Sequence, residues 1–167
     1  MKIRAERKSD WEYVYQINAS AFDTEAEAKL VNALREQAQP IVSLVAVDSG
    51  ELVGHILFSP VTLTGSPDLK LMGLAPMAVS SARQGKGIGS ALVREGLAQC
   101  KKLGFSAVVV LGHPAYYPRF GFVPASRFGI DSEYDAPDEA FMALELVPGS
   151  LHGRTGQARF HAAFKDV

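Results

Sequence analysis

The most constraining feature of this sequence is a glycine-rich stretch, Gln84-Gly85-Lys86-Gly87-Ile88-Gly89-Ser90, which lies between a strand-like run and a helix-like run. Because alternate positions lack a Cβ atom, the backbone can turn sharply and bring successive N–H groups close to one anion. Residues 90–103 are expected to form a helix, whose N-terminus adds a partial positive charge at the same place. The stretch therefore predicts a site for a phosphorylated cofactor.

Two well-known phosphate-binding motifs do not match this stretch. A P-loop requires a glycine where this chain has Ser80, and a Ser or Thr where it has Gly87. A dinucleotide-binding fingerprint that begins at Gly85 requires a glycine at Ser90, and one that begins at Gly87 requires it at Leu92. The pattern that remains is Gln-x-x-Gly-x-Gly.

The segments on either side of the stretch carry further signals. Before it, residues 71–79 form an apolar, strand-like run that contains Pro76. Because proline cannot donate to a sheet ladder, this run is an edge strand, a bulged strand or no strand. After the helix, residues 107–111 form the short apolar run expected of a buried strand. The pattern Tyr-x-x-x-Gly-Phe follows at residues 117–122.

From residue 71 to residue 122 the chain resembles the GNAT superfamily of acyl-CoA-dependent N-acetyltransferases. In that family the Gln-x-x-Gly-x-Gly loop binds the pyrophosphate of CoA, and the fourth strand bulges just before it. The resemblance implies an α/β (α+β) fold with a mixed, mostly antiparallel sheet flanked by helices. It also implies acetyl-CoA as the cofactor, with CoA as the product.

The resemblance also implies roles for individual residues. Tyr117 lies where many members carry their general acid, which protonates the departing thiolate, and the N–H of Val79, freed by the bulge, would polarise the thioester carbonyl. His113 stands where many members have a cofactor-binding asparagine. The cofactor-binding residues expected from the bulged strand, the loop and the tyrosine segment are Met77, Ala78, Val79, Gln84, Gly85, Lys86, Gly87, Ile88, Gly89, Ser90, His113 and Tyr116.

Two adjacent tyrosines compete for the role of general acid. Tyr116 lies about 100° around a helical turn from Tyr117, so the two are not expected to face one sulfur atom. The spacing to Gly121 and Phe122 selects Tyr117. With an unperturbed pKa of about 10, a phenol is protonated at neutral pH and can give its proton to a thiolate whose conjugate acid has a pKa near 8.5.

No motif identifies the general base. Asp23, Glu25 and His55 are candidates, and an ordered water is another. His55 lies inside a strand-like run, where a hydrogen-bonded structural histidine is expected rather than a base. The single cysteine, Cys100, is expected to pack in the core, and the histidines lack the spacing of metal ligands, so no metal is expected.

Length and composition suit one soluble globular domain. The chain has 167 residues, 47% hydrophobic and 21% charged, and we expect a single domain over residues 1–167 with 149–167 as a C-terminal tail packed on it. A net charge of −1 does not indicate a nucleic-acid-binding surface. No apolar run is long enough to span a bilayer and no apolar signal region is present, so we expect a cytoplasmic protein. A monomer and a homodimer both remain open.

The charges are unevenly distributed along the chain. Between residues 83 and 119 Glu95 is the one acid, against six basic residues, which are Arg83, Lys86, Arg94, Lys101, Lys102 and Arg119. A CoA-like anion is expected there. Residues 131–139 carry five acids and no base. We interpret this run as a solvated loop, with attraction of a cationic amine as the alternative.

Apolar spacing and turn residues predict the order of the elements. Asp10 is the expected N-cap of the first helix and Gly104 the expected C-cap of the third, and residues 48–51 give a hairpin signal. Strands are expected at residues 2–5, 41–47, 52–63, 71–79, 105–111 and 140–146, and helices at 10–21, 24–37 and 90–103.

The function predicted from the resemblance is direct transfer of an acetyl group to a primary amine, with no covalent enzyme intermediate. The acceptor is a small-molecule or peptide amine that the sequence does not identify, because many acceptors share one amine chemistry. Two other classes remain open: a non-catalytic acyl-CoA-binding module and an unrelated nucleotide-binding regulator.

Overall fold

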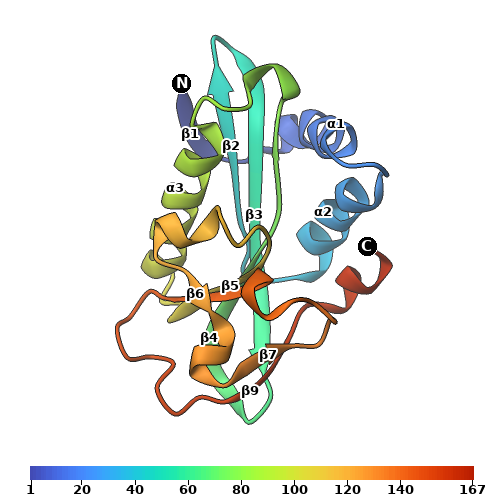
Figure 1. The fold of residues 1–167 in the computed structure, drawn as a ribbon. Coiled ribbons are helices and arrows are strands. Elements are labelled where there is room, and N and C mark those ends of the chain that lie inside the picture. Colours follow the sequence, from blue (N-terminus) through green and yellow to red (C-terminus); the bar gives the residue numbers. More distant parts are fainter.

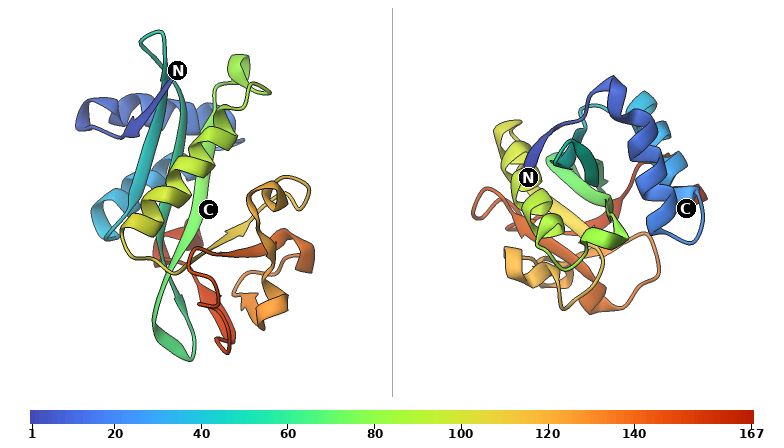
Figure 2. Two further views of the ribbon diagram at one scale, coloured as in Figure 1. Left: turned by 90° about the vertical axis from the view of Figure 1, so that its left-hand side faces the viewer. Right: turned by 90° about the horizontal axis from the view of Figure 1, so that it is seen from above.

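The computed structural model describes residues 1–167, with every side chain except that of Asp166. One sheet runs through the molecule, with α3 against one face and α1 and α2 against the other (Figure 1 and Figure 2). The helices are α1 (Trp11–Ala21), α2 (Ala26–Gln37) and α3 (Ile88–Lys102), with the short 3-10 helices η3 (Tyr117–Phe120) and η6 (Ala162–Asp166). The strands are β1 (Lys2–Ala5), β2 (Val42–Asp48), β3 (Glu51–Leu63), β4 (Ser66–Val79), β5 (Ala107–Leu111), β6 (Val123–Pro124), β7 (Ile130–Ser132), β8 (Phe141–Glu145) and β9 (Gly156–Arg159).

The strand order of the sheet is β1-β2-β3-β4-β5-β8-β6. Neighbours along this order are antiparallel except β4 and β5, which are parallel. β9 joins at the side, antiparallel to the far end of β3 and parallel to β7. The predicted mixed, mostly antiparallel sheet flanked by helices is therefore confirmed.

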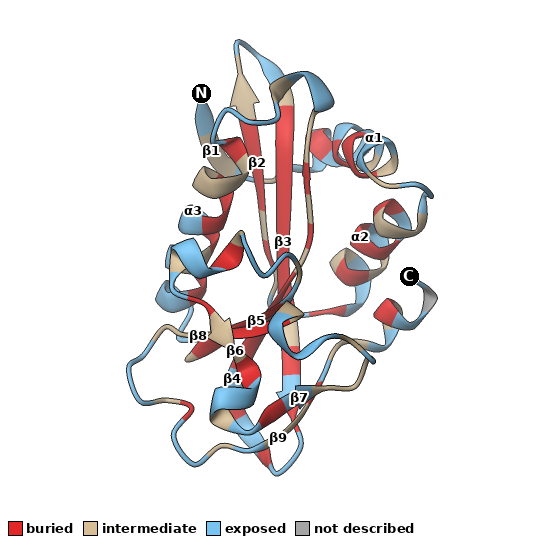
Figure 3. Cartoon of the chain, in the orientation of Figure 1, coloured by how far each residue is buried: buried red, intermediate tan, exposed pale blue. Residues whose placement is uncertain are grey.

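β3 is the centre of the core, and it is buried along most of its length because helices cover both faces of the sheet (Figure 3). On one face, Cys100 of α3 is fully buried in the same cluster as Phe58. Gly96 permits this close approach, since a Cβ there would lie 2.1 Å from the Phe58 ring. On the other face, Leu34 of α2 packs on Leu57. The core thus holds the central strands rigidly between two helical layers.

β4 bulges where the sequence has Pro76. Between its pairs with Ile56 and Phe58 of β3, β4 has two residues, Ala75 and Pro76, where β3 has only Leu57. Two residues facing one is the definition of a β-bulge, which bends the strand and re-aims its backbone groups. The expected bulge before the glycine-rich loop is therefore present.

Beyond the bulge, β4 and β5 separate. The two strands pair only over residues 71–73 and 107–109. Further along, β4 continues beside β3 whereas β5 follows β8. Residues 74–79 of β4 therefore have a strand partner on one side only, and the other side opens toward the loop before α3.

Some element boundaries differ from the prediction. β4 begins at Ser66 rather than at residue 71, because Ser66 pairs with Leu63 in the β3–β4 hairpin and this pairing outweighs the turn-like composition of the first residues. α2 begins at Ala26, with Glu25 at its N-cap position. The strands β6, β7 and β9 were not predicted from the sequence.

Asp10 precedes α1 as predicted, but the expectation that its carboxylate caps the helix was wrong. Its Oδ2 instead accepts the backbone N–H of Arg7 at 2.7 Å and a hydrogen bond from Arg4, also at 2.7 Å. The Arg4 guanidinium holds the pKa of Asp10 below its ordinary value. Asp10 therefore joins the start of α1 to β1.

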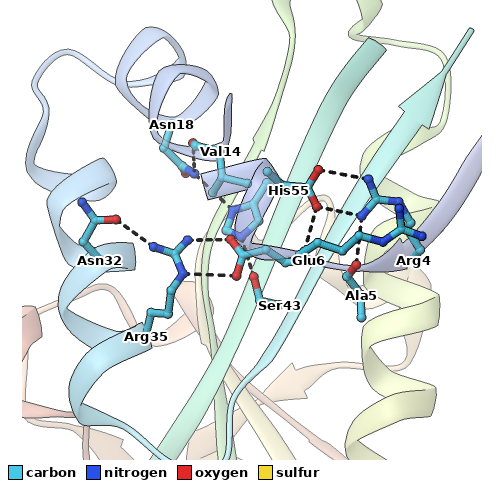
Figure 4. Close-up of polar contacts among 11 residues, drawn as sticks. Arg4, Ala5, Glu6, Val14, Asn18, Asn32, Arg35, Ser43 and His55 are labelled. Carbon is cyan, nitrogen blue, oxygen red and sulfur yellow. Dashed lines mark hydrogen bonds and ion pairs between the residues drawn. The ribbon is translucent and has the colours of Figure 1, made fainter. Parts of the chain in front are cut away.

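A fully buried histidine, His55 of β3, joins α1 to β2 (Figure 4). Its Nδ1 lies 3.1 Å from Nδ2 of Asn18, and its Nε2 lies 2.9 Å from Oγ of Ser43. Since the Asn18 amide nitrogen only donates, Nδ1 accepts and Nε2–H donates to Ser43. Burial lowers the pKa of His55 to about 3, with a smaller contribution from Arg35. The ring is therefore neutral, as a structural histidine in the sheet should be.

This depressed pKa predicts a loss of stability in acid. The unfolded chain, in which the histidine pKa is about 6.5, takes up a proton before the folded chain does, so the contribution of His55 is complete above that pH and is lost toward pH 3. Between pH 7 and pH 5 this group should lower the free energy of unfolding by about 2 kcal/mol. Urea denaturation at both pH values measures the change.

His55→Gln is the informative variant, because glutamine cannot take up a proton in this range. It should be less stable than the wild type at pH 7 but should lose about 2 kcal/mol less on acidification. His152→Gln, at an exposed position, is the matched control and should keep the wild-type pH dependence. An unchanged pH dependence in His55→Gln would show that His55 is not buried in the neutral form.

Candidate active site

The glycine-rich loop leads directly into the N-terminus of α3. Gly85 and Gly87 have φ angles of +78° and +81°, which glycine adopts without strain. The first hydrogen bond of the helix runs from the N–H of Ala91 to the carbonyl oxygen of Gly87 at 3.0 Å. The N–H groups that lack an acceptor within the helix are those of Gly87, Ile88, Gly89 and Ser90. With the exposed Lys86 beside them, these groups can bind an anion.

Three side chains fix the position of the loop. Ile88, the first residue of α3, is buried in the hydrophobic core. The side-chain amide of Gln84 donates to the carbonyl oxygen of Val79 at 3.2 Å, which ties the loop to the end of β4. Arg83 forms an ion pair with Asp48 at the β2–β3 turn. Its charge is therefore partly neutralised within the protein, which leaves Lys86 as the exposed cation of the loop.

The backbone of β4 presents polar groups to the opening between β4 and β5. The N–H of Ser80 donates to the carbonyl oxygen of Val53 on β3 at 2.9 Å. The N–H and C=O groups of successive residues in a strand point to opposite sides. Ala78 therefore also turns its N–H and C=O toward β3, whereas Met77 and Val79 turn theirs away from it. Of the three residues predicted on β4, the structure thus brings Met77 and Val79 to the opening but not Ala78.

Tyr116 borders the loop at the N-terminus of α3. Its Oη lies 3.0 Å from Oγ of Ser90, and a Cβ added at Gly89 would lie 3.3 Å from the same oxygen. The guanidinium of Arg119 lies 4.4 Å from the centre of the tyrosine ring, and its Nε donates to the Tyr116 carbonyl oxygen at 3.0 Å. Tyr116 is therefore held beside the predicted phosphate-binding groups.

Tyr117 is buried and faces another part of the site. Its ring packs edge-on against Tyr116 and Phe122, with ring centres 5.1 and 5.7 Å away. A Cβ at Gly112 would lie 2.6 Å from the ring, so a glycine is required there. Burial raises the pKa of Tyr117 to about 12, with a smaller contribution from Tyr116. The two neighbouring tyrosines thus point to different places, as their spacing predicts.

A cavity of about 380 Å³ lies at the opening, on the side of the sheet that carries α2. Tyr117 and the bulged residues of β4 line one wall, and α2 and η6 contribute to the other. His113 also lines it, with an exposed side chain. The apolar lining side chains are Phe22, Leu30, Leu74, Ala75, Pro76, Met77, Leu111, Phe160, Phe164 and Val167.

Two polar side chains in this cavity have a buried oxygen without a partner. Oε1 of Glu27 and Oη of Tyr134 are both inaccessible to solvent, and neither has a hydrogen bond to any group that the structure describes. Burial is also the main reason that the pKa of Tyr134 is raised. Buried polar atoms are nearly always hydrogen-bonded, so these two oxygens are unusual.

None of the three side chains named from the sequence as candidate bases lines this cavity. His55 is sealed in the core. Glu25 is exposed and accepts a hydrogen bond from the Tyr15 hydroxyl at 3.1 Å, and Asp23 is exposed as well. Glu27, on the cavity wall, was missed because a glutamate in the first turn of a helix is explained by the helix dipole alone.

Two features are absent from the part of the chain that the structure describes. None of its helices is both long and apolar enough to cross a membrane. No group of three or more His, Cys, Asp or Glu side chains is placed to hold a metal ion.

Comparison with known proteins identifies the family. A family model described as an acetyltransferase (GNAT) domain matches residues 2–125. The uncharacterized N-acetyltransferase YhbS of Escherichia coli K12 is 38% identical over 165 residues, which cover 98% of each chain. The crystal structure of E. coli YhbS in complex with CoA superposes with a TM-score of 0.92 at 37% identity, covering 98% of this chain and 91% of that one.

A second solved structure agrees. A GNAT family acetyltransferase from Brucella melitensis, in complex with acetyl-CoA, has a TM-score of 0.79 and 37% identity, covering 98% of this chain and 97% of the other. The family model spans most of the chain, and the similarity to YhbS extends over nearly all of it. The chain therefore belongs to the GNAT family of acetyltransferases.

Proposed function

We propose that this chain is an acetyl-CoA-dependent N-acetyltransferase that transfers the acetyl group directly to a primary amine. The observation that carries the proposal is the opening between β4 and β5, which has anion-binding N–H groups at one end and a cavity with an apolar wall at the other. The similarity to proteins solved with CoA and acetyl-CoA supports the choice of donor. A cofactor with a phosphorylated end, an amide-rich arm and a reactive tip matches this sequence of environments.

Each part of the opening suits one part of that cofactor. The N–H groups at the start of α3 and the Lys86 ammonium would hold the pyrophosphate. The N–H groups of Met77 and Val79 would pair with the amides of the pantetheine arm, as an added strand does at a sheet edge. The Val79 N–H would also polarise the thioester carbonyl as negative charge develops on its oxygen.

Tyr117 is the proposed general acid for the departing thiolate. Burial raises the pKa of Tyr117 to about 12, whereas a thiol in water has a pKa near 8.5. Proton transfer from Tyr117 to a thiolate with that pKa would be unfavourable. The same burial acts on the sulfur, however, because desolvation disfavours the charged thiolate. The buried Cys100 illustrates this effect, as burial raises its pKa to about 12. Exclusion of water from the site would therefore raise the proton affinity of the thiolate as well as that of the Tyr117 phenolate.

The phosphate-binding role of the loop predicts the effect of Gly87→Asp. The new side chain brings a negative charge next to the N–H groups at the start of α3, so the dissociation constant for CoA should rise roughly 10- to 100-fold or more. With the wild type, CoA at about 100 times its dissociation constant should raise the melting temperature by roughly 5 to 10 °C. Thermal denaturation with and without CoA measures both effects.

Gly50→Asp is the matched control. Gly50 has a φ of +80° against +81° for Gly87, and a Cβ at either position meets nothing within 4 Å, so both variants carry a similar backbone strain. Gly50 lies in the β2–β3 turn, so its variant should bind CoA like the wild type. Normal CoA binding by Gly87→Asp would place the phosphate site elsewhere.

The assignment of Tyr117 predicts that Tyr117→Phe lowers kcat by roughly 100- to 10,000-fold, because the ring is kept but the acidic proton is lost. The affinity for CoA should change little. Tyr116→Phe, which removes the hydroxyl beside Ser90, should act mainly on CoA affinity and much less on kcat. Steady-state kinetics with acetyl-CoA, together with CoA titration, separate the two effects.

The pH dependence provides the check. Since burial keeps the Tyr117 phenol protonated to about pH 12, the wild-type kcat should show no decline from phenol ionisation up to about pH 10. Wild-type turnover in Tyr117→Phe, or equal losses of kcat in the two tyrosine variants, would remove Tyr117 as the acid. A chain that binds CoA but acetylates no amine would instead be an acyl-CoA-binding module.

A further inference from the structure

The cavity beyond the bulge of β4 gives information about the acceptor. We propose that the acceptor is a small primary amine with one compact apolar substituent, aryl or branched alkyl, and that Glu27 binds its ammonium group and accepts its proton. This inference rests on the proposed acetyltransferase function. It names the acceptor class and the general base, neither of which follows from family membership.

Two side chains that line the cavity each have a buried oxygen without a hydrogen-bond partner. They are Glu27 of α2, with Oε1, and Tyr134 of the segment after β7, with Oη. An unsatisfied buried polar atom costs about 1 to 3 kcal/mol, and more when it is charged. An ammonium group offers three donors and a positive charge, so it suits a carboxylate and can also donate to a phenol oxygen.

Glu27 is the right kind of group in the right place. Among the lining side chains that the structure describes, it is the only acid, and Tyr117 and the bulge of β4 line the same cavity. A nitrogen held by Glu27 is therefore on the side of the sheet from which it can reach an acetyl group at the opening. Glu25, two residues earlier, is exposed and hydrogen-bonded to Tyr15, so it does not compete for this position.

The other side chains that line the cavity favour an acceptor with an apolar substituent. Phe160 packs against Tyr134 and Phe164, with ring centres 5.9 and 5.3 Å away, and Leu30 adds to the same wall. A volume of about 380 Å³ is near the lower end for ligand pockets, and part of it must admit the acetyl group. Inside the cavity, a further ammonium group of a polyamine or an aminoglycoside would lie against apolar side chains without a partner, which is strongly unfavourable, so such groups would have to stay outside it.

The charge outside the cavity fits a cationic acceptor as well. Tyr134 also lines a neighbouring hollow whose wall carries Asp131, Glu133, Asp135 and Asp138. Such a cluster of one sign attracts cations to the entrance and raises their local concentration. The acidic run thus fits the alternative interpretation from the sequence, attraction of a cationic amine.

The protons in this scheme balance. The ammonium gives one proton to Glu27, which later releases it to solvent, and the nitrogen lone pair attacks the thioester carbonyl carbon. The new N–C bond forms and the C–S bond breaks. The nitrogen loses its second proton as the amide forms, and the thiolate takes one proton from Tyr117, which is restored by the proton from the nitrogen. One ammonium and one acetyl-CoA give one amide, one CoA thiol and one proton.

The first experiment measures kcat/KM for the wild type with acetyl-CoA and three acceptors: 2-phenylethylamine, spermidine and kanamycin. Release of the CoA thiol gives the rate, and mass spectrometry confirms the acetylated product. We expect 2-phenylethylamine to exceed each of the other two at least tenfold. Higher kcat/KM for spermidine or kanamycin would overturn the apolar class while leaving the acetyltransferase function in place.

The second experiment tests Glu27 with three variants. Glu27→Gln keeps the shape but removes the charge and the base, so kcat/KM for 2-phenylethylamine should fall roughly 100-fold or more, with CoA affinity within twofold of the wild type. Glu36→Gln, at an exposed position on the same helix, and Glu25→Gln, the rival base, should both stay within threefold of the wild type.

The outcomes are distinguishable. A purely structural role for Glu27 would lower the melting temperature or the CoA affinity of Glu27→Gln, whereas the proposed role lowers turnover without lowering either of them. Wild-type kcat/KM in Glu27→Gln, or a larger loss in Glu25→Gln, would remove Glu27 as the base. If the wild type binds CoA but acetylates none of the three amines, the proposed function fails rather than the choice of residue.

Discussion

The separation of β4 from β5 is the constraint on which the rest of this structure depends. Backbone groups at a strand edge need partners, and residues 74–79 of β4 have a strand partner only on the β3 side, with the Gln84 side chain bonded to the Val79 carbonyl oxygen on the other. The bulge at Ala75 and Pro76 bends the strand where the pairing ends. The loop before α3 then brings a helix N-terminus to the same edge. One break in the sheet thus creates a backbone surface, an anion site and a cavity together.

The buried polar side chains differ in how far their hydrogen bonds are satisfied. His55 has partners on both ring nitrogens, and Arg35 bonds Glu6 with its Nε 3.3 Å from Oε2, so these groups join helices to strands and are satisfied (Figure 4). Glu27 and Tyr134 each keep a buried oxygen without a partner. Satisfied buried groups specify the fold, whereas the unpartnered oxygens of Glu27 and Tyr134 belong to side chains that line the cavity.

The sequence predicted the parts of the site that local chemistry controls. Gly87 adopts a left-handed conformation that favours glycine, so the residue types located the loop. Pro76 left an edge strand, a bulged strand or no strand open, and the resemblance to the GNAT family selected the bulge. β9 was missed because its partners, β3 and β7, are distant in sequence and its composition is turn-like. Glu27 was missed for a similar reason, since the cavity that gives it a role is assembled from α2, β4 and η6.

Hydrogen exchange of individual backbone amides tests the central claim most directly. Met77 and Val79 turn their N–H groups toward the opening, whereas Ala78 and Ser80 already donate toward β3. Saturating CoA should therefore slow exchange at Met77 and Val79 at least tenfold more than at Ala78 and Ser80, read by NMR on the labelled protein. Equal slowing at all four amides, or none at Met77 and Val79, would contradict the account, because the cofactor would then not lie along this edge of β4.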